Sequence, residues 1–263
     1  MLLPILLVLA QTGAAPARPA VAHATPSPWP AGIDLPAGQP IDEEYRRQFD
    51  LCDAAHRFRG RRPKHGCKGD PNAVTALRRL PGGGIAFVSK LAVDLDGSAI
   101  ACGPRRGRTD QCPTSLMLDD ATGAGVPVDS DAVPYVVIPA AGPHAVRGEF
   151  GRLTGVGVGD FGVVLARGRV VPVIVADTGP YAKLGEGSLA LHRALGHDVC
   201  AERAPGRACS RVVASVESIA GDVVTVLFPG TARDDLTPAT IAAIVRREGS
   251  RLWQERGAAR TSR

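Results

Sequence analysis

Asp177 and Glu186 are the two side chains whose types and spacing best fit acid–base chemistry. They lie nine residues apart in the segment ADTGPYAKLGEGS, at 176–188. Asp177 ends the apolar stretch 170–176, where burial disfavours a charged carboxyl, and Glu186 precedes a predicted helix, whose backbone N–H groups favour a charged one. One protonated and one ionised carboxyl is the pair that glycoside hydrolysis uses. A strand-end Asp and a helix-start Glu are also ordinary turn and capping residues, so the residues alone leave both interpretations open.

Other motifs point to no cofactor and no metal. Residues 157–162 match G-x-G-x-x-G, but a predicted strand follows, so we expect a glycine-rich hairpin and no dinucleotide site. Residues 94–97 (Asp-Leu-Asp-Gly) lack the later ligands of a calcium loop and are expected to form a tight acidic turn. His192 and His197 lack metal-ligand spacing, and no G-x-S-x-G elbow is present.

Short strands rich in Val and Ile, bounded by Gly, Pro or Asp, must position the carboxylates. We expect strands at 85–88, 91–94, 135–139, 162–166, 170–176, 212–216 and 223–228. Arg167-Gly168-Arg169 is expected to be a turn, and Ala220-Gly221-Asp222 a hairpin turn between the last two strands.

Two helices are predicted. One runs from Glu186 or Ser188 to Leu195 and is closed by Gly196. The other opens with Thr237 as N-cap and continues to about residue 256, with apolar residues at helical spacing. Those apolar residues are Ile241, Ile244, Val245 and Leu252.

The composition is that of a globular protein. The chain has 263 residues, 44% of them hydrophobic, with 31 Lys+Arg against 26 Asp+Glu and a net charge of +5. The 31 Gly and 22 Pro favour short strands and turns over a helical bundle. The basic residues are scattered, and the one dense run, at 57–64, lies between two cysteines, so we expect no nucleic-acid partner.

The N-terminus is typical of an exported protein. Residues 1–10 form an apolar core, and A-x-A patterns follow at 15–17 and 20–22. A mis-assigned start or a buried segment is the alternative. We expect a signal peptide at 1–17, a mature chain starting between Ala15 and His23, and a secreted or periplasmic protein that acts as a monomer, away from membranes.

Six cysteines form three sequence-local pairs, separated by 15, 10 and 9 residues. Six cysteines allow 15 connectivities, so local pairing is a hypothesis. The expected pairs are Cys52–Cys67, Cys102–Cys112 and Cys200–Cys209.

The chain resembles the chitosanases of glycoside hydrolase family 75 over roughly residues 87–228. The resemblance is carried, in the family's order, by blocks at 91–97, 131–139, 159–164, 173–180 and 185–191. The family's catalytic Asp, in its D-T motif, falls on Asp177, and its catalytic Glu, in its G-E-x-S motif, falls on Glu186.

The resemblance implies an inverting endo-hydrolase of chitosan. The D-T-G segment is also similar to catalytic segments of double-psi β-barrel proteins. The expected fold class is therefore mainly β, a compact double-psi-like barrel with few peripheral helices, including a C-terminal helix. The expected organisation is signal peptide (1–17), Pro/Ala-rich linker (18–40), disulfide-closed extension (41–80), catalytic barrel (81–230) and helix (237–256).

Chitosan is a polycation, so an acidic groove must offset the net charge of +5. The residues expected to contact substrate are Asp94, Asp96, Asp160, Thr178, Tyr135 and Tyr181. The two tyrosines are candidates for stacking on sugar rings, with core packing the alternative for Tyr135. Either carboxylate could be the acid.

Two other functions remain open from the sequence. A lytic-transglycosylase-like barrel that cleaves peptidoglycan carries a similar A-x-D-T-G segment and would need only Asp177. A polysaccharide- or wall-binding barrel would use both carboxylates to hold cationic amines without turnover.

Overall fold

The computed structural model describes residues 27, 29–41, 77–103, 111–139, 149–179, 183–203, 208–213 and 218–257. The expectations for the signal peptide, for Cys52–Cys67 and for Tyr181 lie outside these residues. No helix in these ranges is long and apolar enough to cross a membrane.

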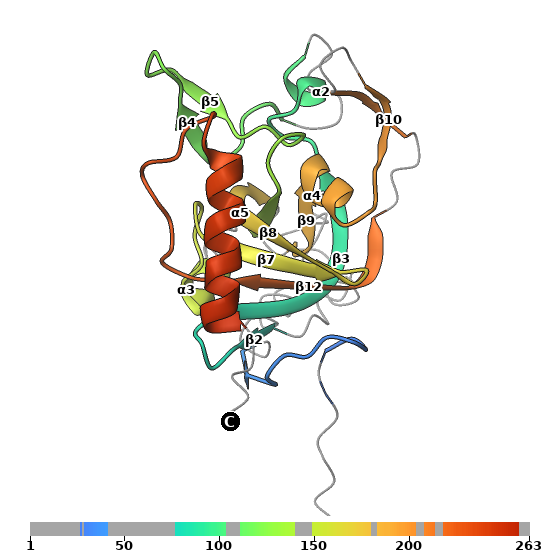
Figure 1. Cartoon of the computed structure of the whole chain (residues 1–263), viewed down its shortest axis with the longest axis vertical. Coiled ribbons are helices and arrows are strands. Elements are labelled where there is room, and N and C mark those ends of the chain that lie inside the picture. The colour runs from blue at the N-terminus through green and yellow to red at the C-terminus, as the bar shows by residue number, and fades with distance from the viewer. Residues whose placement is uncertain are drawn as a thin grey trace, which may run out of the picture.

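Six strands close into a β-barrel (Figure 1). In barrel order they are β3 (Ile85–Asp94), β12 (Ile219–Leu227), β7 (Phe161–Ala166), β8 (Arg169–Gly179), β6 (Tyr135–Pro139) and β9 (Glu186–Ser188), and β9 pairs back with β3. The β6–β8 and β3–β9 pairs are parallel, and the other pairs are antiparallel. The predicted fold class is confirmed.

Smaller elements surround the barrel. Outside it lie β1 (Gln39–Pro40), β2 (Leu77–Arg79), the hairpin of β4 (Met117–Asp119) and β5 (Gly125–Pro127), the hairpin of β10 (Cys200–Arg203) and β11 (Cys209–Val212), and the helices α2 (Ala99–Cys102), α3 (Glu149–Thr154), α4 (Leu189–Ala194) and α5 (Ile241–Leu252). A π-helical turn, η4 (Trp253–Gly257), follows α5. In Figure 1 the long red helix α5 runs across β7, β8 and β12.

The barrel strands are buried on both faces because α5 covers one side of the sheet. Along β7, Phe161, Val163 and Leu165 belong to an apolar cluster that includes the buried face of α5. The alternate residues Val164 and Ala166 belong to a second cluster. A strand buried on both faces has a continuous run of apolar residues in its sequence, which is why these strands could be predicted.

Several predicted boundaries are wrong. The expected strands 85–88 and 91–94 are one strand, β3. The expected hairpin turn at 220–222 lies inside β12, where the register with β3 shifts between Ile219 and Val223. Gly221 and Asp222 have positive φ there, so the turn-forming residues build a bulge.

Of the two expected starts of the first helix, the structure has the later one. Helix α4 begins at Leu189 with Ser188 as its N-cap, so Glu186 lies on strand β9. Helix α5 begins at Ile241, after a turn in which Thr237 O accepts from the backbone N–H groups of Thr240 and Ile241.

Two of the three expected disulfides lie within the described residues, and both are present. Cys102 is bonded to Cys112, and Cys200 to Cys209. Both pairings are confirmed. Structural disulfides are typical of proteins outside the reducing cytosol.

Candidate functional site

Strand β8 delivers Asp177 at the end of a buried run, as the sequence predicts. The side chains at 173–176 are fully buried, and Asp177 itself is 6% exposed. Its Oδ1 atom accepts hydrogen bonds from Ser115 N (2.8 Å), Ser115 Oγ (2.6 Å) and Thr178 N (2.8 Å). The carboxylate is therefore held on one oxygen by three donors.

The segment that carries Ser115 is fastened on both sides. Thr114 Oγ1 donates to Leu116 O (2.6 Å) and accepts from Val128 N (2.9 Å). Leu116 N donates to Ala176 O on β8 (2.8 Å). Ser115 is thus fixed beside the end of β8.

Glu186 is placed by the barrel and not by a helix. It lies on β9, where its Cα partner on the parallel strand β3 is Ala92. Its Oε1 atom forms an ion pair with Lys183 Nζ at 2.6 Å, and the two side chains are only 16% and 10% exposed. The ammonium of Lys183, instead of a helix N-terminus, is the group that stabilises an ionised Glu186.

The structure brings the two carboxylates to one face of β8. A Cβ atom built on Gly179, at the end of β8, would lie 3.3 Å from Glu186 Oε2. Side chains two residues apart on a strand point to the same face, so Asp177 shares this face with Gly179.

Asp177 belongs to a cluster of three carboxylates. Asp94 and Asp96, at the end of β3, each offer an oxygen, and these oxygens and one of Asp177 all lie within 4.8 Å of one another. All three residues are buried, with 4–6% exposure. Among the described residues, this is the group whose donors could hold a divalent cation. The tight turn predicted at 94–97 is present, with Gly97 at φ 79°.

Tyr135 is a core residue. Its side chain is 0% exposed, and its hydroxyl donates to Asp96 O (2.9 Å). Burial, together with the nearby Asp94, Asp177 and Asp96, raises the pKa of Tyr135 well above its usual range. The ring has no face for a sugar, so its expected stacking role is wrong and the core alternative holds.

Asp160 also has a structural role. Its Oδ1 atom accepts from Thr231 N (2.7 Å) and Ala232 N (3.0 Å), and its Oδ2 atom from Gly157 N (2.9 Å). These backbone donors occupy a carboxylate that is 3% exposed. The expected contact with substrate is not supported at Asp160, because the carboxylate ties two loops together.

Thr178 is half-buried beside Asp177. Its hydroxyl lies 2.8 Å from Ser115 Oγ. It remains an expected substrate contact beside Asp177.

Two buried serines connect the strands that carry the site. Ser188 Oγ accepts from Tyr135 N (3.0 Å) and Leu191 N (3.1 Å) and donates to Val133 O (2.8 Å). Ser130 Oγ donates to Asp94 O (2.7 Å) and accepts from Leu189 N (3.0 Å).

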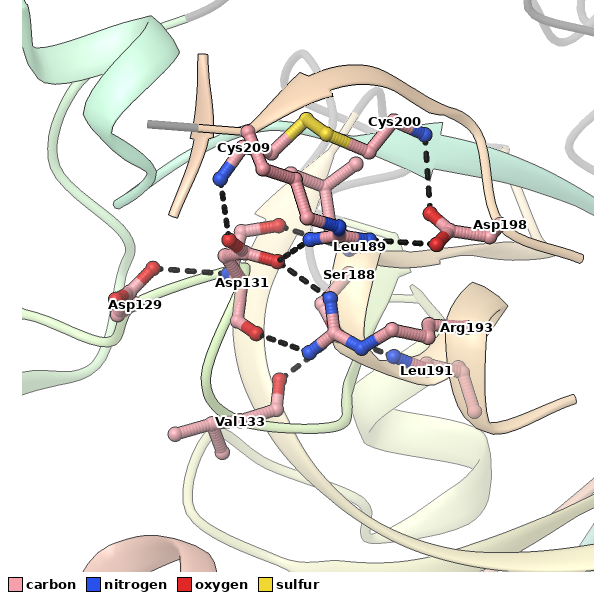
Figure 2. Close-up of polar contacts among 12 residues, drawn as sticks. Asp129, Asp131, Val133, Ser188, Leu189, Leu191, Arg193, Asp198, Cys200 and Cys209 are labelled. Atoms are coloured by element: carbon pink, nitrogen blue, oxygen red, sulfur yellow. Dashed lines mark hydrogen bonds and ion pairs between the residues drawn. A yellow bond between two sulfur atoms is a disulfide. The ribbon is translucent and has the colours of Figure 1, made fainter. Parts of the chain in front are cut away.

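The same region is tied to the disulfide hairpin (Figure 2). Asp131 Oδ1 pairs with Arg193 Nη1 (2.6 Å), and its Oδ2 atom accepts from Cys209 N (2.6 Å). Asp131 therefore links α4 to the β10–β11 hairpin, which the Cys200–Cys209 bond closes.

Sequence reasoning did not identify Ser115, Ser130 or Lys183 as site residues. Lys183 stands three residues before Glu186, and this i,i+3 spacing was an available signal. Ser115 lies 62 residues from Asp177, and nothing in its local sequence marks the contact.

No family model and no curated protein matches this chain.

Proposed function

We propose that this protein is a secreted, endo-acting glycoside hydrolase that cleaves β-1,4 linkages of chitosan with inversion. The observation that carries the proposal is the placement of Asp177 and Glu186 on one face of the end of β8, because Gly179, two residues after Asp177 on this strand, lies against Glu186 Oε2. Inverting enzymes hold their carboxyl groups ~6.5–9.5 Å apart, to leave room for water, whereas retaining enzymes hold them ~5–5.5 Å apart.

The charges around the two carboxylates support a division of roles. Glu186 has an ammonium against it and is ionised. The proposal therefore assigns the base to Glu186 and the acid to Asp177.

In the proposed reaction, Asp177 transfers its proton to the glycosidic oxygen as the bond from that oxygen to C1 breaks. Glu186 removes a proton from a water molecule on the opposite face of the sugar, and the water oxygen bonds to C1. The acidic cluster also supplies local negative charge for a cationic substrate, although the whole chain carries +5.

One observation favours a second function. Because Lys183 already pairs with Glu186, Asp177 could work as the one reactive carboxyl, as in a lytic-transglycosylase-like cleavage of peptidoglycan. The two functions differ in whether Glu186 is needed.

The experiment compares reducing-end release from chitosan, chitin and peptidoglycan by the full mature chain and two variants, Asp177→Asn and Glu186→Gln. We expect activity on chitosan and a loss of ~10²–10⁴-fold in either variant, the usual range for a general acid or base. Asp234→Asn and Glu202→Gln make the same chemical changes at exposed positions and should retain full activity.

Three results would contradict the proposal. Full chitosanase activity in Glu186→Gln would rule out the two-carboxylate mechanism. Turnover of peptidoglycan alone, sensitive only to Asp177→Asn, would establish the second function. Binding of chitosan without any turnover would identify a binding barrel.

A further inference from the structure

We propose that Ser115 is a positioning residue for Asp177: it fixes the carboxyl group so that the catalytic proton is carried on Oδ2. This inference rests on the proposed function for its catalytic consequence. Its structural part concerns the Asp177 carboxyl alone and can be tested without turnover.

Three hydrogen-bond donors occupy one oxygen of the Asp177 carboxyl group. Asp177 Oδ1 accepts from Ser115 Oγ, Ser115 N and Thr178 N, at 2.6–2.8 Å. An oxygen with three hydrogens directed at it has no remaining lone pair for a proton of its own. A protonated Asp177 therefore carries its hydrogen on Oδ2, and the proton leaves from that oxygen.

The neighbouring donors and acceptors fix the direction of the hydrogen bonds made by the Ser115 and Thr178 hydroxyl groups. Ser115 has one hydroxyl hydrogen, and Asp177 Oδ1 is an acceptor, so this hydrogen is directed to Asp177. Ser115 Oγ also lies 2.8 Å from Thr178 Oγ1 and accepts from Thr178 N at 3.1 Å. The Thr178 hydroxyl must then be the donor to Ser115. The two hydroxyl groups form a chain that runs from Thr178 through Ser115 to the carboxylate.

Contacts of the adjacent residues hold Ser115 in place. Its neighbours Thr114 and Leu116 are hydrogen-bonded to Val128 and to β8, and the Cys102–Cys112 bond closes the loop three residues earlier in the chain. Ser115 itself is exposed. Replacing it by Ala removes a hydroxyl group from the surface and opens no cavity in the core, so the variant is expected to fold.

The kinetic test compares Ser115→Ala, Ser115→Thr and the wild-type chain on chitosan. A hydrogen bond to a charged group contributes enough to reduce kcat by roughly 10- to 100-fold when it is lost. We expect that reduction in Ser115→Ala with KM within about twofold, since Ser115 acts on the carboxyl and not on substrate. Ser115→Thr retains the hydroxyl and should restore most of kcat. Ser210→Ala removes an exposed hydroxyl from β11 and is the matched control.

The second readout is independent of turnover. In ¹³C NMR at a fixed pH, the Asp177 carboxyl resonance of Ser115→Ala should differ in chemical shift from that of the wild type, because Oδ1 loses one of its three donors. An unchanged resonance would overturn the proposal whether or not the enzyme is active. A shifted resonance with no wild-type turnover would support the positioning of Asp177 and contradict the proposed function. Wild-type kcat in Ser115→Ala would overturn the catalytic part.

Discussion

At Glu186 the central feature is the ion pair with Lys183. The Nζ–Oε1 distance is 2.6 Å, and both side chains are largely shielded from water. A shielded ammonium favours the ionised carboxylate, which is the form that a general base requires. Lys183 is therefore expected to determine the pH at which Glu186 begins to work.

Lys183→Met tests this dependence. Without the ammonium, Glu186 should remain protonated to higher pH, so the acidic limb of the pH–rate profile on chitosan should move to higher pH. Activity near pH 5 should fall several-fold, with recovery at higher pH, and Lys183→Arg should keep the wild-type profile. An unchanged profile in Lys183→Met would show that Glu186 is not the base.

At this scale the sequence marks the two carboxylates of the proposed mechanism but not their partners. Asp177 and Glu186 stand out because a buried strand and a turn surround them. Ser115 does not, because its contact with Asp177 depends on how the chain folds back over 62 residues. Tyr135 was ambiguous because an aromatic residue in an apolar strand fits a core and a sugar platform equally well.

At the scale of elements, His192 fastens α4 to β3 close to the site. Its Nε2 atom lies 3.1 Å from Ala92 O, and its Nδ1 atom 2.9 Å from His197 Nδ1. The carbonyl can only accept, so Nε2 carries the hydrogen and the neutral ring accepts from His197 at Nδ1. Burial, with a contribution from His197, lowers the pKa of His192 from 6.5 to about 4.

This pKa predicts how stability depends on pH. Between about pH 4 and pH 6.5 the unfolded chain binds a proton at His192 that the folded chain does not bind, so the free energy of unfolding rises with pH. The contribution is roughly 3 kcal/mol, present above pH 6.5 and lost as the pH falls to about 4. Urea unfolding at several pH values should show the slope in the wild type and a reduced slope in His192→Leu. An equal slope in both would contradict this assignment.

The short elements also show where local patterns mislead. Residues 220–222 have the composition of a turn, yet they form a bulge because β12 continues to pair with β3 on both sides. Glu186 was expected at a helix start because Ser188 caps a helix, but a three-residue strand comes first. Such a strand is recognisable only from its partners, β3 and β6.

At the scale of the whole molecule, α5 packs on the barrel as part of one apolar cluster. Ile241, Ile244, Val245 and Leu252 belong to the same apolar cluster as residues of β6, β7, β8 and β12. The helix packs closely: a Cβ on Gly249 would lie 2.8 Å from Gly162 O and from Pro172 Cβ. Helix α5 therefore packs directly against β8, the strand that carries Asp177.

Leu252→Ala separates stability from catalysis. The side chain is 1% exposed, and a core Leu→Ala change costs ~2–5 kcal/mol of unfolding free energy. Urea unfolding should show that loss, while specific activity per folded molecule on chitosan stays within about twofold. Arg246→Ala, on the exposed side of α5, is the control and should change neither quantity. A loss of turnover without a loss of stability would place α5 in the site.

The mainly β class could be predicted because each strand is an apolar run bounded by turn residues. The barrel closure follows from the pairing of β3 with β9, whose Cα partners Ala92 and Glu186 are far apart in the chain. No local pattern specifies that register. The acidic cluster arises from this closure, since it brings the end of β3 to the end of β8.

The most direct test of the two-carboxylate mechanism is the configuration of the first product. ¹H NMR of chitosan oligosaccharides during hydrolysis by the mature chain distinguishes the anomers before mutarotation equilibrates them. Water attack opposite to the leaving oxygen, with Asp177 as acid and Glu186 as base, predicts that the α-anomer forms first from the β-linked chain. Initial formation of the β-anomer, or no hydrolysis at all, would contradict the account.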